Sequence, residues 1–169
     1  IGDDLFVRRH AVRLVGMELE SRPTLGALLE HVVEDPSPAV RQTLAHILPK
    51  ASDETVERLL PLLLRAENEP AVRAAAVWSI SGLCWRPGLL QGAVHRLLEV
   101  LDQESDSFVL RVALETVVAG YCALESSPEA AKTWIDALLP QVAALHADAE
   151  HLVVRRWAAQ ARERLWGQA

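Results

Sequence analysis

The most informative segment of the sequence reads Asp35-Pro36-Ser37-Pro38-Ala39-Val40-Arg41 and is followed by Leu44 and Leu48. It combines a turn, an aliphatic residue, an arginine and then apolar residues at helical spacing. The same pattern, which we call the repeat segment, occurs five times and ends in turn at Arg8, Arg41, Arg73, Arg111 and Arg155. These arginines are 33, 32, 38 and 44 residues apart. A period of this size is typical of stacked helical hairpins.

The composition also favours helices. Half of the 169 residues are hydrophobic and only 5 % are aromatic, and alanine and leucine, both strong helix formers, dominate. No apolar run reaches the roughly 18 residues that a membrane-spanning helix needs. The net charge of −6 gives the chain no general electrostatic attraction for nucleic acid.

Proline, glycine and capping residues divide the chain into helices. They predict helices over 3–20, 23–34, 39–50, 53–65, 71–85, 89–102, 107–124, 128–147 and 151–166. We therefore expect one all-α domain, an α-solenoid (superhelix) of about four and a half antiparallel helix pairs, with units at 1–20, 23–50, 53–85, 89–124 and 128–169. Because the first helix lacks a partner and the sequence begins with Ile1, we expect a fragment of a longer chain.

Two of the first helices in these pairs contain a Leu-Leu-Pro motif, at Leu59-Leu60-Pro61 and at Leu138-Leu139-Pro140. The alternation of such helices with a turn, an aliphatic–arginine pair and a second helix resembles the HEAT-repeat (HEAT-like α-solenoid) family over almost the whole chain. The resemblance implies that the second helices line a concave wall.

The arginines of the repeat segments are expected to be structural, because a guanidinium group can bridge acidic or carbonyl groups of an adjacent turn. This predicted ladder consists of Arg8, Arg41, Arg73, Arg111 and Arg155. The last helix has Arg162 where earlier second helices have an apolar residue. That charge predicts a polar cap at this end of the stack.

Helical geometry at 100° per residue identifies the exposed side of each second helix. With the aliphatic residue as position zero, the core lies at +4, +7 and +8 and the opposite side at +2, +6, +9 and +13. Trp78 and Trp85 both fall on this opposite side, where tryptophans suit a binding hot spot; alternatively, Trp85 folds over the following turn and Trp78 leans onto a neighbouring helix. The predicted partner-binding residues are Trp78, Trp85, Ser81, His46, Gln42, Arg9, Arg13 and Thr116.

The sequence contains no recognisable catalytic or metal-binding motif. The six histidines lie on different predicted helices, and none pairs with cysteine or histidine at zinc spacing. Cys84 and Cys122 occupy equivalent places on neighbouring helices, too far apart for a disulfide. We therefore expect no enzyme activity, no cofactor and no metal, and two reduced, half-buried thiols in a cytoplasmic protein.

The leading interpretation is a protein–protein interaction or scaffold module that presents its concave wall to a protein or peptide, or to other domains of its parent chain. Membrane and small-molecule partners are not expected. The alternative is nucleic-acid binding by a mildly basic wall, as in the HEAT-like alkylpurine DNA glycosylases, although the carboxylate of Glu163 lies far from Trp78. A third interpretation is a structural spacer within its own chain. Salt dependence separates phosphate contacts from peptide capture.

Overall fold

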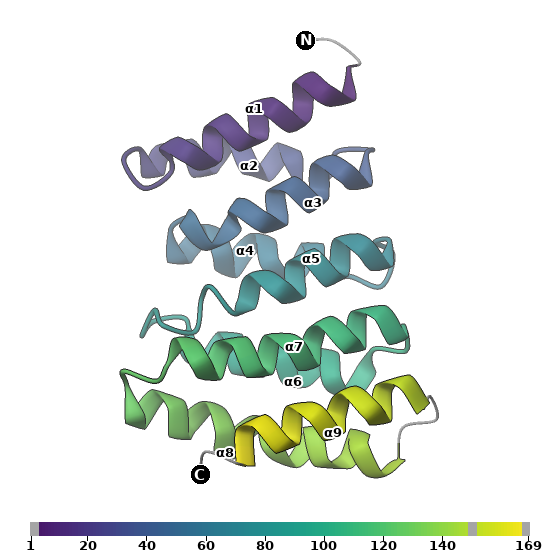
Figure 1. Ribbon diagram of the computed structural model, residues 1–169. Coiled ribbons are helices and arrows are strands. Elements are labelled where there is room, and N and C mark those ends of the chain that lie inside the picture. The colour runs from purple at the N-terminus through teal and green to yellow at the C-terminus, as the bar shows by residue number, and fades with distance from the viewer. Residues whose placement is uncertain (1–3, 149–151, 167–169) are drawn as a thin grey trace. The chain divides into compact units, whose positions relative to one another are not determined.

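The computed structural model describes residues 4–148 and 152–166, and for Asp148 and Trp166 the backbone only. These residues form helices and no strand, in the α-solenoid fold class that the sequence predicts. The elements are α1 (Leu5–Glu18), η1 (Pro23–Leu25), α2 (Gly26–Val32), α3 (Pro38–Ile47), η2 (Leu48–Lys50), α4 (Asp53–Leu63), α5 (Pro70–Ile80), α6 (Leu90–Gln103), α7 (Ser107–Ala123), α8 (Pro128–Asp148) and α9 (Leu152–Trp166) (Figure 1).

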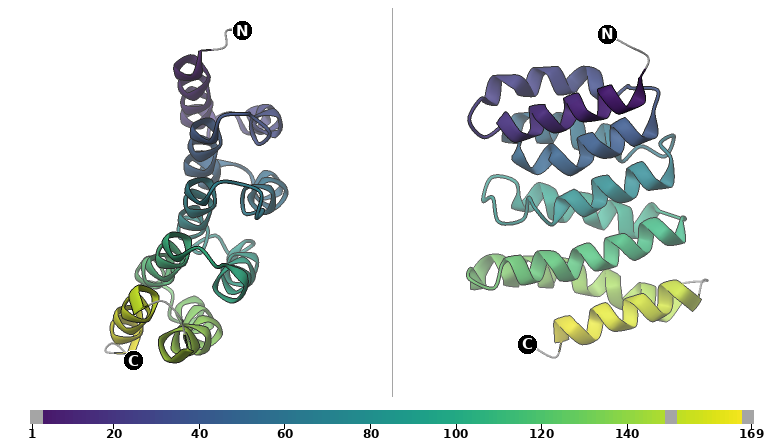
Figure 2. Two further views of the ribbon diagram at one scale, coloured as in Figure 1. Left: turned by 90° about the vertical axis from the view of Figure 1, so that its right-hand side faces the viewer. Right: turned by 45° about the horizontal axis from the view of Figure 1, so that its top comes forward.

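The chain divides into two compact units, residues 1–79 (the first unit) and residues 80–169 (the second unit), and each is described by itself. In the first unit, α1, α3 and α5 form one layer, while α2 and α4 form the other (Figure 2). Helix α1 packs along α3, and α2 contacts both α3 and α4. The aliphatic side chains of Leu29, Leu44 and Leu63 are completely buried. Burial of each one stabilises the folded state by about 1.5–3 kcal/mol.

In the second unit, α7 and α9 lie in one layer and α6 and α8 in the other (Figure 2). Helix α8 packs against α9 and α6, and α9 packs against α7. Trp134 of α8 is completely buried, and its indole Nε1 donates a hydrogen bond to the carbonyl oxygen of Val117 on α7 at 2.8 Å. The ring lies directly on Gly120, where an added Cβ would collide with it. This contact fixes α8 on α7.

The second helices start in the same way. The third residue of each is a valine: Val7, Val40, Val72, Val109 and Val154. An aspartate precedes the first residue of α1 and of α7. Asp4 accepts a hydrogen bond from the Phe6 backbone amide at 2.8 Å, and Asp106 accepts one from Phe108 at 2.9 Å. Side-chain capping of the free amides therefore sets where these two helices begin.

The predicted helix over 71–85 is too long, because α5 ends at Ile80. Beyond it the chain continues in tighter turns. The Leu83 amide donates to the Ile80 carbonyl oxygen, and the Arg86 amide to that of Leu83, in both cases three residues back. Gly82, with its low helix propensity, stands where the α-helix gives way to these turns. Consequently Trp85 does not share a helix face with Trp78.

The two cysteines are free, but neither is half-buried as the sequence suggests. Cys84 is buried and Cys122 is exposed. The Cys84 thiol lies 3.0 Å from the Ser81 carbonyl oxygen and 3.6 Å from that of Gly120 on α7. Burial raises the pKa of the Cys84 thiol to about 11. The difference arises because Cys84 lies in the turns after α5, which fold onto α7, whereas Cys122 lies at the end of α7.

Candidate partner-binding surface

Two arginines of the first unit join consecutive helix pairs. Arg8 on α1 donates from Nε to Asp35 Oδ2 at 2.9 Å and from Nη2 to Asp35 Oδ1 at 3.4 Å. Arg41 on α3 bonds the carbonyl oxygen of Asp35 and the carboxylate of Glu69, the residue before α5. The pKa of Glu69 is lowered, chiefly by a backbone amide hydrogen bond and further by the charge and hydrogen bond of Arg41. The turn before α3 is thus tied to α1, and the turn before α5 to α3.

The remaining predicted ladder residues lie on α5, α7 and α9. Arg73 donates to the carbonyl oxygen of Asn68, in the turn before α5, at 2.5 Å. Arg155 is exposed and is the fourth residue of α9, the place that Arg8 and Arg41 hold on α1 and α3. The fourth residue of α7 is Leu110, so α7 has no arginine at this place.

The sequence analysis therefore assigned the position-zero residue of α7 one residue too late. The helix start aligns Val109, not Leu110, with Val72, and this places Thr116 at +7, a core position. Thr116 is completely buried, and its hydroxyl donates to the Val112 carbonyl oxygen at 2.8 Å; its expected exposure was wrong. Arg111 falls at +2. Instead of bridging turns, its guanidinium group stacks on aromatic rings.

Those rings belong to Phe108 on α7 and Trp157 on α9. The central carbon of the Arg111 guanidinium lies 5.5 Å from each ring centroid. Glu115 Oε1 lies 3.7 Å from Arg111 Nε. Cation–π contacts of this kind typically contribute about 0.5–1 kcal/mol at exposed sites. Arg111 therefore joins α7 to α9 within the second unit.

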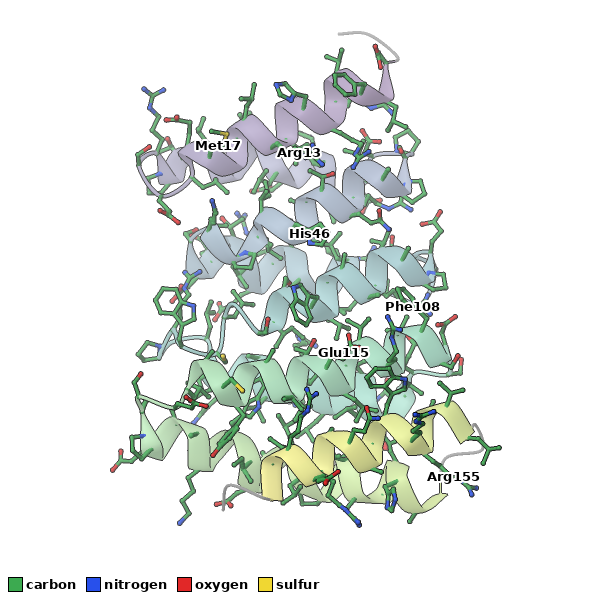
Figure 3. All side chains as sticks on the ribbon, in the orientation of Figure 1. Arg13, Met17, His46, Phe108, Glu115 and Arg155 are labelled. Atoms are coloured by element: carbon green, nitrogen blue, oxygen red, sulfur yellow. The ribbon has the colours of Figure 1, made fainter. Side chains whose placement is uncertain are left out.

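The first unit carries an exposed row on its α1–α3–α5 layer. Arg13, His46 and Trp78 each stand six places after the valine at the third helical position, and all three are exposed, with Trp78 at 44 %. Figure 3 shows Arg13, Met17 and His46 on the visible face of α1 and α3. We call Arg13, His46 and Trp78 the Trp78 row. Neighbouring helix axes lie about 8–10 Å apart, so the row spans roughly 20 Å.

Further residues extend this surface. Arg9 and Gln42 are partly exposed at +2 on α1 and α3, and Arg9 Nε lies 3.4 Å from the Thr43 hydroxyl. Met17, which the sequence analysis missed, is 71 % exposed. It stands four places after Arg13, only about 40° around the helix, but at +10 it falls outside the expected exposed positions of +2, +6, +9 and +13.

Two predicted partner-binding residues lie elsewhere. Trp85 is 63 % exposed and Ser81 is partly exposed, and both follow α5 and belong to the second unit. The structure thus brings Arg9, Arg13, Gln42, His46 and Trp78 onto one layer of the first unit (Figure 2). Ser81, Trp85 and Thr116 belong to the second unit.

The two layers of the first unit differ in charge. Helices α2 and α4 together hold four acidic residues and one arginine: Glu30, Asp53, Glu54, Glu57 and Arg58. Helices α1, α3 and α5 together hold one acidic residue, Glu18, and five arginines: Arg8, Arg9, Arg13, Arg41 and Arg73. The layer with the Trp78 row is therefore the basic one.

Over 4–148 and 152–166, no three histidine, cysteine or acidic side chains gather closely enough to hold a metal ion. No helix in this part of the chain has the length and apolarity that crossing a bilayer requires.

Antiparallel helix pairs in two layers within each unit (Figure 2), with arginines of α1 and α3 bonded to the turns before α3 and α5, define a helical-repeat protein of the α-solenoid class. A family model described as HEAT repeats matches residues 25–117, more than half of the chain. The chain therefore belongs to the HEAT-repeat family. No curated protein and no solved structure shows significant similarity to it. HEAT repeats are commonly protein-interaction scaffolds and are typically not catalytic.

Proposed function

We propose that the first unit is a protein-interaction module without catalytic activity of its own, and that a partner polypeptide lies across the Trp78 row. The observation that carries this proposal is the repetition of one exposed position on three consecutive second helices. Arg13, His46 and Trp78 occupy it, so that a cation, an imidazole and an indole stand side by side. Such a row suits an extended segment of about six residues.

Trp78 supplies the anchor of the proposed surface. Its indole remains 44 % exposed on a helix whose neighbouring residues Val77 and Ser79 are buried. Tryptophan and arginine are the residues most enriched in binding hot spots. Met17, with its flexible side chain, adds apolar area that can adapt to a partner.

A cytoplasmic location is part of the proposal. Both thiols are free, and Cys122 is exposed. An exposed free thiol is typical of a reducing compartment, since it would be oxidised or paired in a secreted protein.

Selection from a library of random displayed peptides tests the proposed function without assuming a partner. Peptides enriched on the intact chain are expected to lose binding to the Trp78→Ala variant. The matched control is Trp85→Ala, which removes another exposed tryptophan, in the second unit. Circular dichroism and thermal unfolding verify that both variants are folded. If enrichment is absent, or if the enriched peptides bind Trp78→Ala as well as the parent chain, the proposed function is wrong.

A further inference from the structure

We propose that the partner of the α1–α3–α5 layer is an acidic polypeptide segment with an apolar side chain near one end. This inference rests on the proposed function and names the chemistry of its partner. The apolar side chain packs on Trp78, and the carboxylates lie toward Arg13 and Arg9.

Three arginines of this layer are already engaged in contacts within the fold. Arg8 is paired with Asp35, and Arg41 with Glu69. Arg73 is bonded to backbone carbonyl oxygens of its own turn. Arg8 and Arg41 are therefore neutralised within the fold, and the hydrogen bonds of Arg73 hold its guanidinium group against the turn before α5.

Three other cations of the first unit differ from Arg8 and Arg41 in this respect. Among the described residues, no carboxylate lies within ion-pair distance of Arg13, Arg9 or Lys50, the last residue of η2. Arg13 and Lys50 are exposed. The acidic residue of the layer, Glu18, stands at the end of α1 with its Oε2 3.8 Å from Arg22 Nε. Uncompensated positive charge therefore remains on the α1 and α3 side of the Trp78 row.

The surface changes along the row from positively charged to apolar. Arg13 on α1 provides a full positive charge, His46 on α3 an imidazole, and Trp78 on α5 a mostly apolar face. A segment that places carboxylates over α1 and an apolar side chain over α5 complements all three. This complementarity also fixes the direction in which the segment lies, because reversal would put carboxylates against the indole.

A peptide is favoured over nucleic acid by the small number of cations. Neutralising a phosphate backbone takes many cations at regular intervals, whereas the first unit has three without a carboxylate partner among the described residues. The net charge of −6 would also repel a polyanion. A short acidic segment needs only two or three charge contacts and gains the rest of its affinity from the indole and Met17.

The test compares two synthetic peptides by fluorescence anisotropy at low and at physiological salt. The first carries glutamates followed by one leucine; the second has each glutamate replaced by lysine. A random-sequence DNA duplex forms the third probe. We expect the acidic peptide to bind, the basic one not to, and Arg13→Glu to weaken binding about tenfold. The control Lys132→Glu changes the net charge equally, at an exposed residue of α8, and should leave the affinity unchanged.

The outcomes distinguish this inference from the proposed function. If the peptides selected from the random library depend on Trp78 but are neutral or basic, the proposed function stands and the acidic partner is wrong. Equal loss of binding in Arg13→Glu and Lys132→Glu would show a non-specific charge effect and overturn the inference. DNA binding that Arg13→Glu weakens and Trp78→Ala does not would replace the peptide with nucleic acid.

Discussion

Arg8 and Asp35 form a two-bond ion pair between helix α1 and the turn that precedes α3. The pair is partly buried, with 27 % of the Arg8 side chain and 11 % of the Asp35 side chain exposed. Asp35 Oδ1 also accepts a hydrogen bond from the Ser37 backbone amide at 2.9 Å. The Asp35 carboxylate thus accepts a hydrogen bond within its own turn and also holds helix α1.

The first prediction concerns this pair. Arg8→Ala should lower the free energy of unfolding by about 1 kcal/mol, because a charge-assisted bidentate contact is lost at a partly exposed site. Asp35→Ala should cost more, about 2 kcal/mol, since the turn amide also loses its acceptor. Urea denaturation of both variants and of the double variant gives the coupling energy. A coupling near zero would mean that the observed pair does not stabilise the stack.

The second prediction contrasts two glycines of the second unit. A Cβ at Gly120 would collide with the rigid ring of Trp134, whereas at Gly92 no atom outside its own helix lies within 4 Å of that position. Gly120→Ala should therefore destabilise the protein by about 1–3 kcal/mol. Gly92→Ala should stabilise it by up to about 1 kcal/mol, because alanine is the better helix former. Thermal unfolding of the two variants gives the sign of each stability change. Equal changes in Gly120→Ala and Gly92→Ala would contradict the close contact of α8 with α7.

The sequence predicts the helices well because turns and caps are local signals. The predicted helices over 3–20, 53–65 and 107–124 begin within one residue of Asp4, Ser52 and Asp106, which the structure has as caps. The same local signals position the Trp78 row, since a start fixes which residues of a helix face outward. These local signals do not reveal that Val109, and not Leu110, is the position-zero residue of α7. There Val109 and Leu110 are both aliphatic, and only the observed helix start decides between them.

The end of α5 shows a second limit. Nothing in the local pattern of residues 81–85 stops a helix except Gly82, and the apolar spacing continues through Cys84. The turn that replaces the helix is held by a tertiary contact, the Cys84 thiol against the Gly120 carbonyl oxygen on α7. Such contacts depend on residues far away in the sequence, so helix propensity alone does not reveal them.

The third prediction concerns the cysteines. Iodoacetamide at neutral pH should modify Cys122 and leave Cys84 unmodified, because the thiolate is the reactive form and burial raises the pKa of Cys84 to about 11. Peptide mapping by mass spectrometry identifies the modified residue, and Cys122→Ser should abolish native-state labelling. Rapid modification of Cys84 in the folded protein would contradict its burial.

The raised pKa of Cys84 also has a consequence for stability at alkaline pH. The folded state binds the Cys84 thiol proton more tightly than the unfolded state does. The stabilisation of the folded state by this protonated thiol is therefore complete below about pH 9 and is lost between about pH 9 and pH 11. Stability of the parent chain should therefore fall more steeply over this range than that of Cys84→Ala. The comparison uses the slope of the free energy of unfolding against pH. The loss of the Cys84 side chain lowers this free energy by the same amount at every pH and so does not change the slope.

The fourth prediction tests the contact of Arg111 with Phe108 and Trp157. Lysine keeps the charge but not the planar group that stacks on both rings, so Arg111→Lys should lower the free energy of unfolding by about 0.5–1 kcal/mol. The matched control is Arg164→Lys, at an exposed residue of α9, which should change stability by less than about 0.5 kcal/mol. Urea denaturation measures both. If Arg111→Lys costs no more than the control, the positive charge alone suffices and the rings do not hold the guanidinium group.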